Sequence, residues 1–526
     1  MPVPVRRWLP LALVAFAALW LRTHDLAARP MHSDEANQAV KCGELLESGR
    51  YAFDPRDHHG PVLYYAALPI AWLRGQRTLA ALDETTVRLV PAIAGTVSVV
   101  LLFVLALPLG FWAALAAAAF LAVSPPAVYY SRYFVQETML VTFTVAAAVS
   151  GRAWWKTRTP GWAIATGLFA GLMQATKASA PIFIVAALCS LFVVPASAGI
   201  RFGSTDAGAN MRRLGLVRDL ALALAAALAI AALFYSSFGT HVAGVSDAIA
   251  TYRLTAARLA GGLTGHEKPW WYFLTLFGWQ RNGGLVFEQV GFTALALTGG
   301  IVVLGRSLLA GDSTRASFPS PASRLLQWAA VYTVLVAVLI SFPAYKTPWH
   351  ALHLIPGLAL LAAGALHAIV FLPFSPSPRL PGVALAKPGL PIFLSAACAV
   401  IALTFLTRQT HLAAFLRPAD ARNPYAYVHS APDVLKFRAL ADAALARTPN
   451  RPVRVISAEY WPLPWYFRGL AQVGYWTTPP VDCDGALVIA SIENADTVRS
   501  RLAGKYGESI LGLRPGFLCV VFTPSP

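Results

Sequence analysis

The chain has 526 residues, of which 57% are apolar and only 13% are charged. A soluble protein of this length does not bury so much apolar surface, so the composition excludes an ordinary soluble enzyme and indicates an integral membrane protein. The formal net charge is +17, but the cations lie in short loops between apolar runs, and there is no basic stripe with interleaved aromatic residues. We therefore expect membrane lipids, and not nucleic acid, as partners.

Apolar runs long enough to cross the hydrocarbon core of a bilayer recur along the chain. We predict eleven of them as transmembrane helices. No small-residue cleavage site follows the first run, so we interpret it as an uncleaved helix and not as a signal peptide. The predicted spans are 8–22, 86–107, 111–128, 134–150, 161–176, 180–195, 217–236, 290–305, 325–342, 350–372 and 389–407.

The basic residues between these spans predict how the chain is oriented in the cell membrane. They concentrate in four loops, which are all cytoplasmic if the N-terminus is cytoplasmic, as the positive-inside rule requires. These residues are Arg152, Lys156 and Arg158; Arg201, Arg212, Arg213 and Arg218; Arg306, Arg315 and Arg324; and Arg379 and Lys387. The same orientation puts two long loops, 23–85 and 237–289, on the extracytoplasmic side.

The chain changes character after residue 407. Short apolar runs predict three buried strands, and amphipathic runs predict two helices. In that order, the segments are 453–457, 485–491 and 517–522, and 432–447 and 494–504. We predict a polytopic α-helical transmembrane domain, 1–407, followed by a small extracytoplasmic α/β domain, 408–526. Its position outside the cell would permit a disulfide between Cys483 and Cys519.

The strongest local signal follows the first predicted helix, where His32, Ser33, Asp34 and Glu35 are consecutive. Adjacent carboxylates at a membrane surface are costly to desolvate, so one of them tends toward a raised pKa, as a general base requires. The alternative is a helix start, with Ser33 or Asp34 as the N-cap and Glu35 in the first turn. Because the two interpretations are compatible, we predict Asp34 and Glu35 as catalytic residues.

A second signal lies in the same loop, where Asp57 precedes His58 and His59. An aspartate beside two histidines can bind a divalent metal, and a solvated turn is the alternative. No cofactor is certain from these residues. A divalent metal remains an option, with Asp34, His58 and Glu137 as its candidate ligands.

Further polar residues lie at predicted helix ends on the same side of the membrane. Glu137 lies at the start of the fourth span, where a carboxylate is a candidate functional residue. The alternative is an ion pair with Arg132 that only anchors the helix. Lysines at such positions either pair with a phosphate or reach the lipid headgroups. The candidate substrate-binding residues are His32, His58, His59, Arg132, Lys177, Tyr345, Lys346 and His350. Together they can activate an acceptor and bind a lipid-linked phosphate leaving group.

These residues resemble the motifs of GT-C membrane glycosyltransferases, in the superfamily of the dolichyl-phosphate-mannose-protein mannosyltransferases. Asp34 and Glu35 match the acidic pair of the first outer loop, in which the aspartate is usually catalytic. Glu137, after Ser131-Arg132-Tyr133, resembles the later acidic motif, with glutamate in place of the commoner aspartate. Thr176-Lys177 resembles a Thr-Lys pair that ends the fifth span, and the segment 59–65 resembles a basic and proline-rich helix start without its double proline.

Two other segments resemble a narrower bacterial and archaeal family whose archaeal members carry a flippase-associated label. These are Lys346-Thr347-Pro348-Trp349 and the aromatic segment 460–466 of the tail. The resemblance as a whole implies a GT-C-like fold of about 11 transmembrane helices.

The resemblance also implies a mannosyltransferase-like enzyme that transfers a hexosyl group. The donor would be a polyprenyl-phosphate-linked sugar, and the acceptor a protein, lipid or glycan at the outer face. Asp34, or Glu35 in its place, would deprotonate the acceptor, and Glu137 would orient the acceptor or a metal. The residues that would stabilise the departing lipid phosphate are Arg132, Lys177 and Lys346. The alternatives are a lipid-linked sugar flippase and a non-catalytic assembly protein in cell-surface glycan synthesis.

Overall fold

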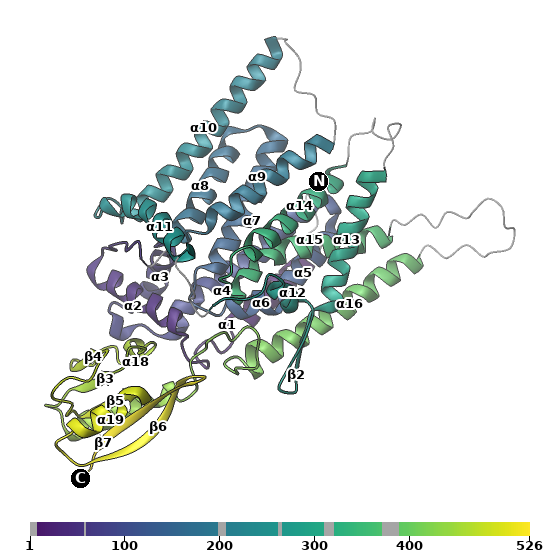
Figure 1. Cartoon of the computed structure of the whole chain (residues 1–526). Coiled ribbons are helices and arrows are strands. Elements are labelled where there is room, and N and C mark those ends of the chain that lie inside the picture. Colours follow the sequence, from purple (N-terminus) through teal and green to yellow (C-terminus); the bar gives the residue numbers. More distant parts are fainter. Residues whose placement is uncertain are drawn as a thin grey trace.

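The structure, a computed structural model, describes residues 8–56, 59–197, 207–260, 266–309, 320–370 and 389–525. Long helices form a bundle, and a small sheet domain lies at one end of it (Figure 1). We call this end of the bundle the domain end. The C-terminus lies in the sheet domain, whereas the described chain begins toward the opposite end of the bundle (Figure 1).

A helix lies at every predicted span. The helices are α1 (Leu9–Thr23), α4 (Glu84–Ala106), α5 (Phe111–Val123), α6 (Pro125–Tyr130), α7 (Glu137–Thr157), α8 (Pro160–Thr176), α9 (Ala180–Ser197), α10 (Ala207–Tyr235), α13 (Val290–Leu309), α14 (Pro321–Ser341), α15 (Ile355–Val370) and α16 (Gly389–His411). In the described part of the chain, five helices are long and apolar enough to cross a membrane, and shorter apolar helices accompany them.

One predicted span is divided in two. The segment 111–128 breaks at Ser124, which has an extended backbone between α5 and α6. Pro125 and Pro126 follow Ser124 directly. A proline disfavours helical geometry in the residue before it and cannot donate an N–H to the preceding turn, so α5 ends there.

Glycines allow several of these helices to pack closely. A Cβ on Gly167 would lie 2.0 Å from the carbonyl oxygen of Ala223, where α8 crosses α10. A Cβ on Gly299 would lie 2.0 Å from the carbonyl oxygen of Leu361, where α13 crosses α15. Close backbone approach of this kind is typical of helix packing in membranes, where there is little hydrophobic gain between apolar surfaces.

The two long loops have structure of their own. The first contains α2 (Ser33–Ser48), α3 (Val62–Leu73) and the short η2 (Leu79–Ala81). The second contains α11 (Ala243–Ala260), α12 (Tyr272–Phe277) and a hairpin of β1 (Trp279–Asn282) and β2 (Leu285–Glu288). The next linker leads into the 3₁₀ helix η4 (Pro348–Leu354), which precedes α15, and the one-turn π-helix η5 (Leu412–Leu416) follows α16.

The sheet domain contains every strand that the sequence predicts and two more. Its strands are β3 (Val453–Ile456), β4 (Val473–Trp476), β5 (Leu487–Ser491), β6 (Tyr506–Arg514) and β7 (Phe517–Pro524), and its helices are α17 (Val434–Arg447), α18 (Leu463–Tyr466) and α19 (Ile492–Arg501). The strand order is β4-β3-β5-β7-β6, with parallel pairs around β3 and antiparallel pairs around β7. The two strands that the prediction missed, β4 and β6, are the edge strands, whose residues are less buried than those of β5.

The disulfide that the sequence would permit does not form. Cys483 and Cys519 are both free and buried. Cys519 packs with Val455 and Ile489 on one face of the sheet, whereas Cys483 packs with Val488 on the other. Because the sheet lies between the two sulfur atoms, they cannot bond.

Candidate active site

The start of α2 sets the environment of the acidic pair. The Asp34 backbone N–H donates to Nδ1 of His32 (3.1 Å), and the His32 backbone N–H donates to the Glu35 carboxylate (3.1 Å). The N-cap is therefore His32, and not Ser33 or Asp34 as the helix-start alternative assumed. The Nε2 atom of His32 lies 3.0 Å from the carbonyl oxygen of Tyr427, to which it donates, because a carbonyl oxygen can only accept.

Glu35 is fully buried and paired. Its carboxylate accepts hydrogen bonds from Arg88 (2.5 and 2.9 Å) and from Arg29 (3.2 Å). The backbone N–H of Phe134 adds another at 3.0 Å. Burial alone would raise the pKa of Glu35, but the charges of Arg88 and Arg29 and these hydrogen bonds lower it to about 2. A carboxylate so strongly held in its ionised form does not support the predicted role of Glu35 as a base.

Asp34 has the opposite environment. It is partly exposed, and its carboxylate has no hydrogen bond or ion pair to another residue of the described chain. Arg88 fixes its position indirectly, because the guanidinium also donates to the carbonyl oxygens of Leu26 (2.5 Å) and Arg29 (2.9 Å). The sequence reasoning missed Arg29 and Arg88. For Arg88 the signal was available, since it is the third residue of the predicted span 86–107, and a charged residue in a transmembrane helix needs a partner.

Glu137 pairs with Lys177 and not with Arg132. The Lys177 ammonium at the end of α8 contacts the Glu137 carboxylate at the start of α7, and both side chains are largely buried. His59 lies beside Lys177 in an isolated β-bridge, and the Gly60 N–H donates to the carbonyl oxygen of Thr176 (3.0 Å). The structure thus brings together three of the predicted site residues, which come from distant parts of the sequence.

A polar contact joins this pair to the helix that carries Asp34. Gln38 of α2 accepts a hydrogen bond from the Gln136 side chain (2.9 Å), next to Glu137, and also contacts the hydroxyl of Tyr64 in α3. Asp34 precedes Gln38 by four residues and therefore lies one turn away on the same face of α2. Asp34, Glu137 and Lys177 are consequently at the same end of the bundle, as the enzyme hypothesis requires.

The third side of the site comes from the linker before α15 and the segment that precedes the sheet domain. The His32 ring lies 6.1 Å from Trp349 and 5.8 Å from His429. His350 accompanies Trp349 in η4 and lies within electrostatic range of Lys177. The predicted His32 and His350 therefore border the same region as the pair at Lys177.

Three of the predicted substrate-binding residues, Arg132, Tyr345 and Lys346, contact backbone segments of the chain. The guanidinium of Arg132 donates to the carbonyl oxygens of Leu21 (3.2 Å), His24 and Asp25 at the end of α1. The buried Lys346 donates to the carbonyl oxygens of Lys268 (3.0 Å) and Pro343, and Tyr345 forms a β-bridge with Glu267. Arg132 and Lys346 therefore join backbone segments, and their predicted contact with a leaving phosphate stays a prediction.

The metal hypothesis has no donor set among the residues with described positions. No group of three or more His, Cys, Asp or Glu side chains there is suited to bind a metal ion. His58 lies outside the described residues. The ammonium of Lys177 already contacts Glu137, which disfavours a metal on the same carboxylate. We therefore assign no step to a metal.

Comparisons with known proteins agree with this architecture. Residues 59–203 match the family model described as dolichyl-phosphate-mannose-protein mannosyltransferase. The crystal structure of ArnT from Cupriavidus metallidurans bound to undecaprenyl phosphate is similar over 97% of both chains, with 16% identity and a TM-score of 0.61. The archaeal oligosaccharyltransferase AglB from Archaeoglobus fulgidus, in complex with an inhibitory peptide and a dolichol-phosphate, is similar over 96% of this chain and 73% of its own, with 15% identity and a TM-score of 0.54.

A comparison with curated protein sequences finds no match. The structural similarity confirms the predicted GT-C-like fold, and the family match confirms the predicted resemblance within that superfamily. The narrower flippase-associated family stays a prediction.

Proposed function

We propose that this chain is a membrane glycosyltransferase that moves a sugar from a polyprenyl-phosphate donor to a protein, lipid or glycan acceptor. The observation that carries the proposal is the contrast within the acidic pair. Glu35 is buried between two arginines, whereas the neighbouring Asp34 carboxylate is partly exposed and has no partner elsewhere in the described chain. A fixed backbone with one unpaired carboxylate is what a general base needs.

In the proposed step, Asp34 accepts the proton of the nucleophilic group of the acceptor. The deprotonated atom forms a bond with the anomeric carbon of the sugar. The bond from that carbon to the phosphate oxygen breaks, and its electron pair leaves with the polyprenyl phosphate. A single displacement of this kind inverts the configuration at the anomeric carbon.

Lys177 is our candidate for stabilising the leaving phosphate. An ammonium has three N–H donors, and the contact with Glu137 occupies one of them. Glu137 is almost completely buried, so we assign it the positioning of Lys177 and not a contact with the acceptor. His59 and His350, which lie near Lys177, are the candidates for further donor contacts.

The nature of the donor is supported by the similar structures, because ArnT is bound to undecaprenyl phosphate and AglB to a dolichol-phosphate. We propose that the domain end of the bundle is extracytoplasmic, with the N-terminus and the basic loops in the cytoplasm. We further propose that the tail, 408–526, borders the acceptor side, since its first segment contacts His32 through Tyr427. No observation favours the flippase or the assembly protein over this enzyme.

The test is complementation of a deletion strain, with mass spectrometry of its glycans and glycoproteins. We expect wild-type chain to restore a missing sugar and Asp34→Asn to lower transfer by about 10²- to 10⁴-fold, as loss of a general base does. Asp54→Asn is the matched control, because Asp54 is an exposed aspartate of the same loop. If Asp34→Asn transfers sugar at the rate of the control, Asp34 is not the base.

A further inference from the structure

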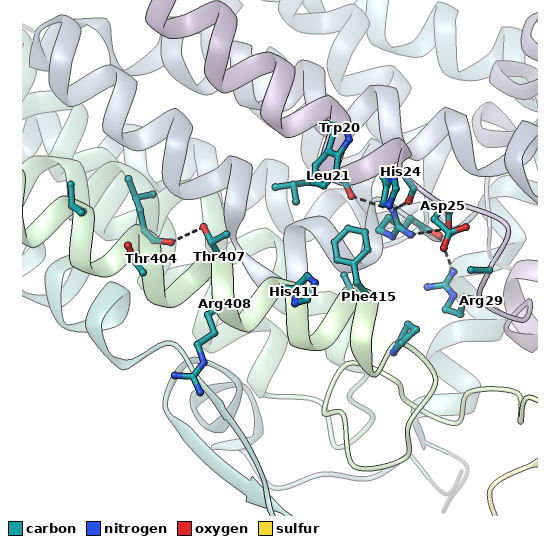
Figure 2. Close-up of a pocket in the computed structure, with 16 residues that line it drawn as sticks. Trp20, Leu21, His24, Asp25, Arg29, Thr404, Thr407, Arg408, His411 and Phe415 are labelled. Atoms are coloured by element: carbon teal, nitrogen blue, oxygen red, sulfur yellow. Dashed lines mark hydrogen bonds between the residues drawn. The ribbon is translucent and has the colours of Figure 1, made fainter.

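A pocket of about 840 Å³ lies between the end of α1 and the last turns of α16, apart from the candidate active site (Figure 2). α1 packs on α4 and α5, and α16 packs on α15, α5 and α6. The pocket thus separates the ends of two helices that each pack on the rest of the bundle. Its volume is in the range that accommodates a small ligand or a lipid headgroup.

The polar part of the pocket is positively charged. Three arginines line it, Arg29, Arg132 and Arg408, against the single carboxylate of Asp25. Figure 2 shows Arg29 near Asp25 and Arg408 farther along α16. Arg132 uses three N–H groups for carbonyl oxygens of the chain and, as an arginine, has five. The buried Nε of Arg29 has no hydrogen-bond partner among the described residues. These unused donors match the oxygens of a phosphate, which arginine binds particularly well.

The other part of the pocket is apolar and continuous with the surface of the bundle. Trp20 is 52% exposed and Val400 is 62% exposed, and both line the pocket. Farther along the same helices, Phe16 of α1 and Phe393 of α16 are also exposed. In a bilayer these side chains contact acyl chains, so an amphipathic molecule can enter the pocket from the side.

The pocket is separate from the site at Asp34. Asp34, Glu137 and Lys177 do not line it. Arg29 links the two, because it lines the pocket and pairs with Glu35 in the first turn of α2. Since Lys177 does not line the pocket, we distinguish a phosphate bound there from the group that leaves the sugar near Lys177.

We propose that this pocket binds the phosphate headgroup of an anionic glycerophospholipid of the surrounding bilayer, which joins the ends of α1 and α16. The guanidinium groups select the negative charge, and the apolar wall contacts the acyl chains. This binding does not depend on sugar transfer, so the two proposals can fail separately.

The test is native mass spectrometry of the full chain in detergent with added phosphatidylglycerol or phosphatidylcholine. We expect one phosphatidylglycerol to bind per chain, with clear preference over phosphatidylcholine. Arg408→Gln should weaken this binding by about fivefold, the effect of one basic residue near a lipid phosphate. Arg417→Gln is the control, because Arg417 is a half-exposed arginine that does not line the pocket and lies near Asp420.

A second variant tests the pocket without a change of charge. Ala28 lines the pocket and is exposed, so the side chain of Ala28→Trp should fill the pocket and weaken phosphatidylglycerol binding. The melting temperature of the lipid-free chain should stay unchanged. Inorganic phosphate should not displace the lipid, because it lacks acyl chains. Equal phosphatidylglycerol binding by Arg408→Gln, Ala28→Trp and wild type would overturn the proposal. So would one-for-one displacement by undecaprenyl phosphate, which would make the pocket the donor site.

Discussion

Asp34 and Glu35 are adjacent in the sequence and have opposite environments. The Glu35 side chain is fully buried, two arginines compensate its charge, and two backbone N–H groups donate hydrogen bonds to it. The Asp34 side chain lies outside that network and is partly exposed. Removing one partner of a buried ion pair leaves an uncompensated charge, so the network is essential to the position of α2 even though it does no chemistry.

This network predicts how stability depends on pH. The pKa of Glu35 is about 2 in the folded chain, against an ordinary value of 4.5. As the pH falls, Glu35 is therefore protonated in the unfolded chain before it is protonated in the folded chain. Its contribution to the free energy of unfolding is complete above about pH 4.5 and is lost progressively toward pH 2. We expect a melting temperature that falls across this window in detergent-solubilised wild type.

Glu35→Gln should lose that pH dependence and destabilise the chain by about 3–5 kcal/mol, because Arg88 and Arg29 then lack their counter-charge. Melting temperatures of the variant and wild type between pH 2 and pH 7 check this. Glu47→Gln, at an exposed position of the same helix, is the control and should retain the wild-type slope. A retained slope in Glu35→Gln would assign the pH dependence to other carboxylates.

At the scale of elements, the site depends on how closely the start of α3 approaches the end of α8. Gly60 donates its N–H to Thr176, and a Cβ on Gly60 would lie 2.0 Å from the carbonyl oxygen of Ala175. Only glycine fits this approach, which puts His59 beside Lys177. The departure from the double-proline motif therefore has a structural reason in this chain.

Gly60→Ala should separate the two segments and move Lys177 away from its contacts. We expect a cost of about 1–3 kcal/mol from the overpacked contact and a loss of sugar transfer larger than the loss of folded protein. Gly161→Ala in α8 is the control, because a Cβ there meets no atom within 4 Å. Equal transfer by the two variants, measured per folded chain, would contradict a role for this approach.

At the scale of the whole molecule, the sheet domain is attached directly to the loop that carries Asp34. The hydroxyl of Tyr466 accepts a hydrogen bond from the Met31 N–H (2.8 Å), and the Ser33 hydroxyl donates to the carbonyl oxygen of Trp461 (3.3 Å). The buried Trp465 donates its indole N–H to Glu84 at the start of α4 (2.7 Å). The aromatic segment 460–466 thus contacts the residues just before Asp34 and the start of α4.

Tyr466→Phe should lower sugar transfer without unfolding the sheet domain. The lost hydrogen bond leaves the buried Met31 N–H without an acceptor. This should destabilise the loop next to Asp34 by about 1–3 kcal/mol. Limited proteolysis and transfer rates measure the two effects. Tyr460→Phe is the control, since the Tyr460 hydroxyl has no hydrogen bond in the described part of the chain. Identical transfer rates for the two variants would argue against a role of the attached sheet domain in sugar transfer.

The orientation of the whole chain is tested by labelling cysteines in intact cells with an impermeant maleimide. Val481→Cys, at a position 93% exposed in the sheet domain, should react from outside. Thr157→Cys, at the other end of α7 from Glu137, should react only after the cells are permeabilised. The reverse pattern would put Asp34 and Lys177 in the cytoplasm and remove the basis for an extracytoplasmic enzyme.

The sequence by itself determined the membrane class, the positions of the long helices and the central strands of the tail. These follow from apolar runs and their periods, which are local properties of the chain. The sequence also placed Asp34, Glu137 and Lys177 among the candidates, because ionisable residues beside or within apolar helices on one side of the membrane are functional candidates. The boundary at residue 407 between the two predicted parts stays a prediction.

Only the tertiary structure decided which of these residues act together. It paired Glu137 with Lys177 and not with Arg132, and it placed Arg29 and Arg88 on Glu35. Ion pairs between residues far apart in the chain depend on how helices pack, and packing is set by side-chain shape and close backbone approach, which a one-dimensional pattern does not contain. The same reason explains why the sequence suggested a disulfide across a sheet whose two faces keep the cysteines apart.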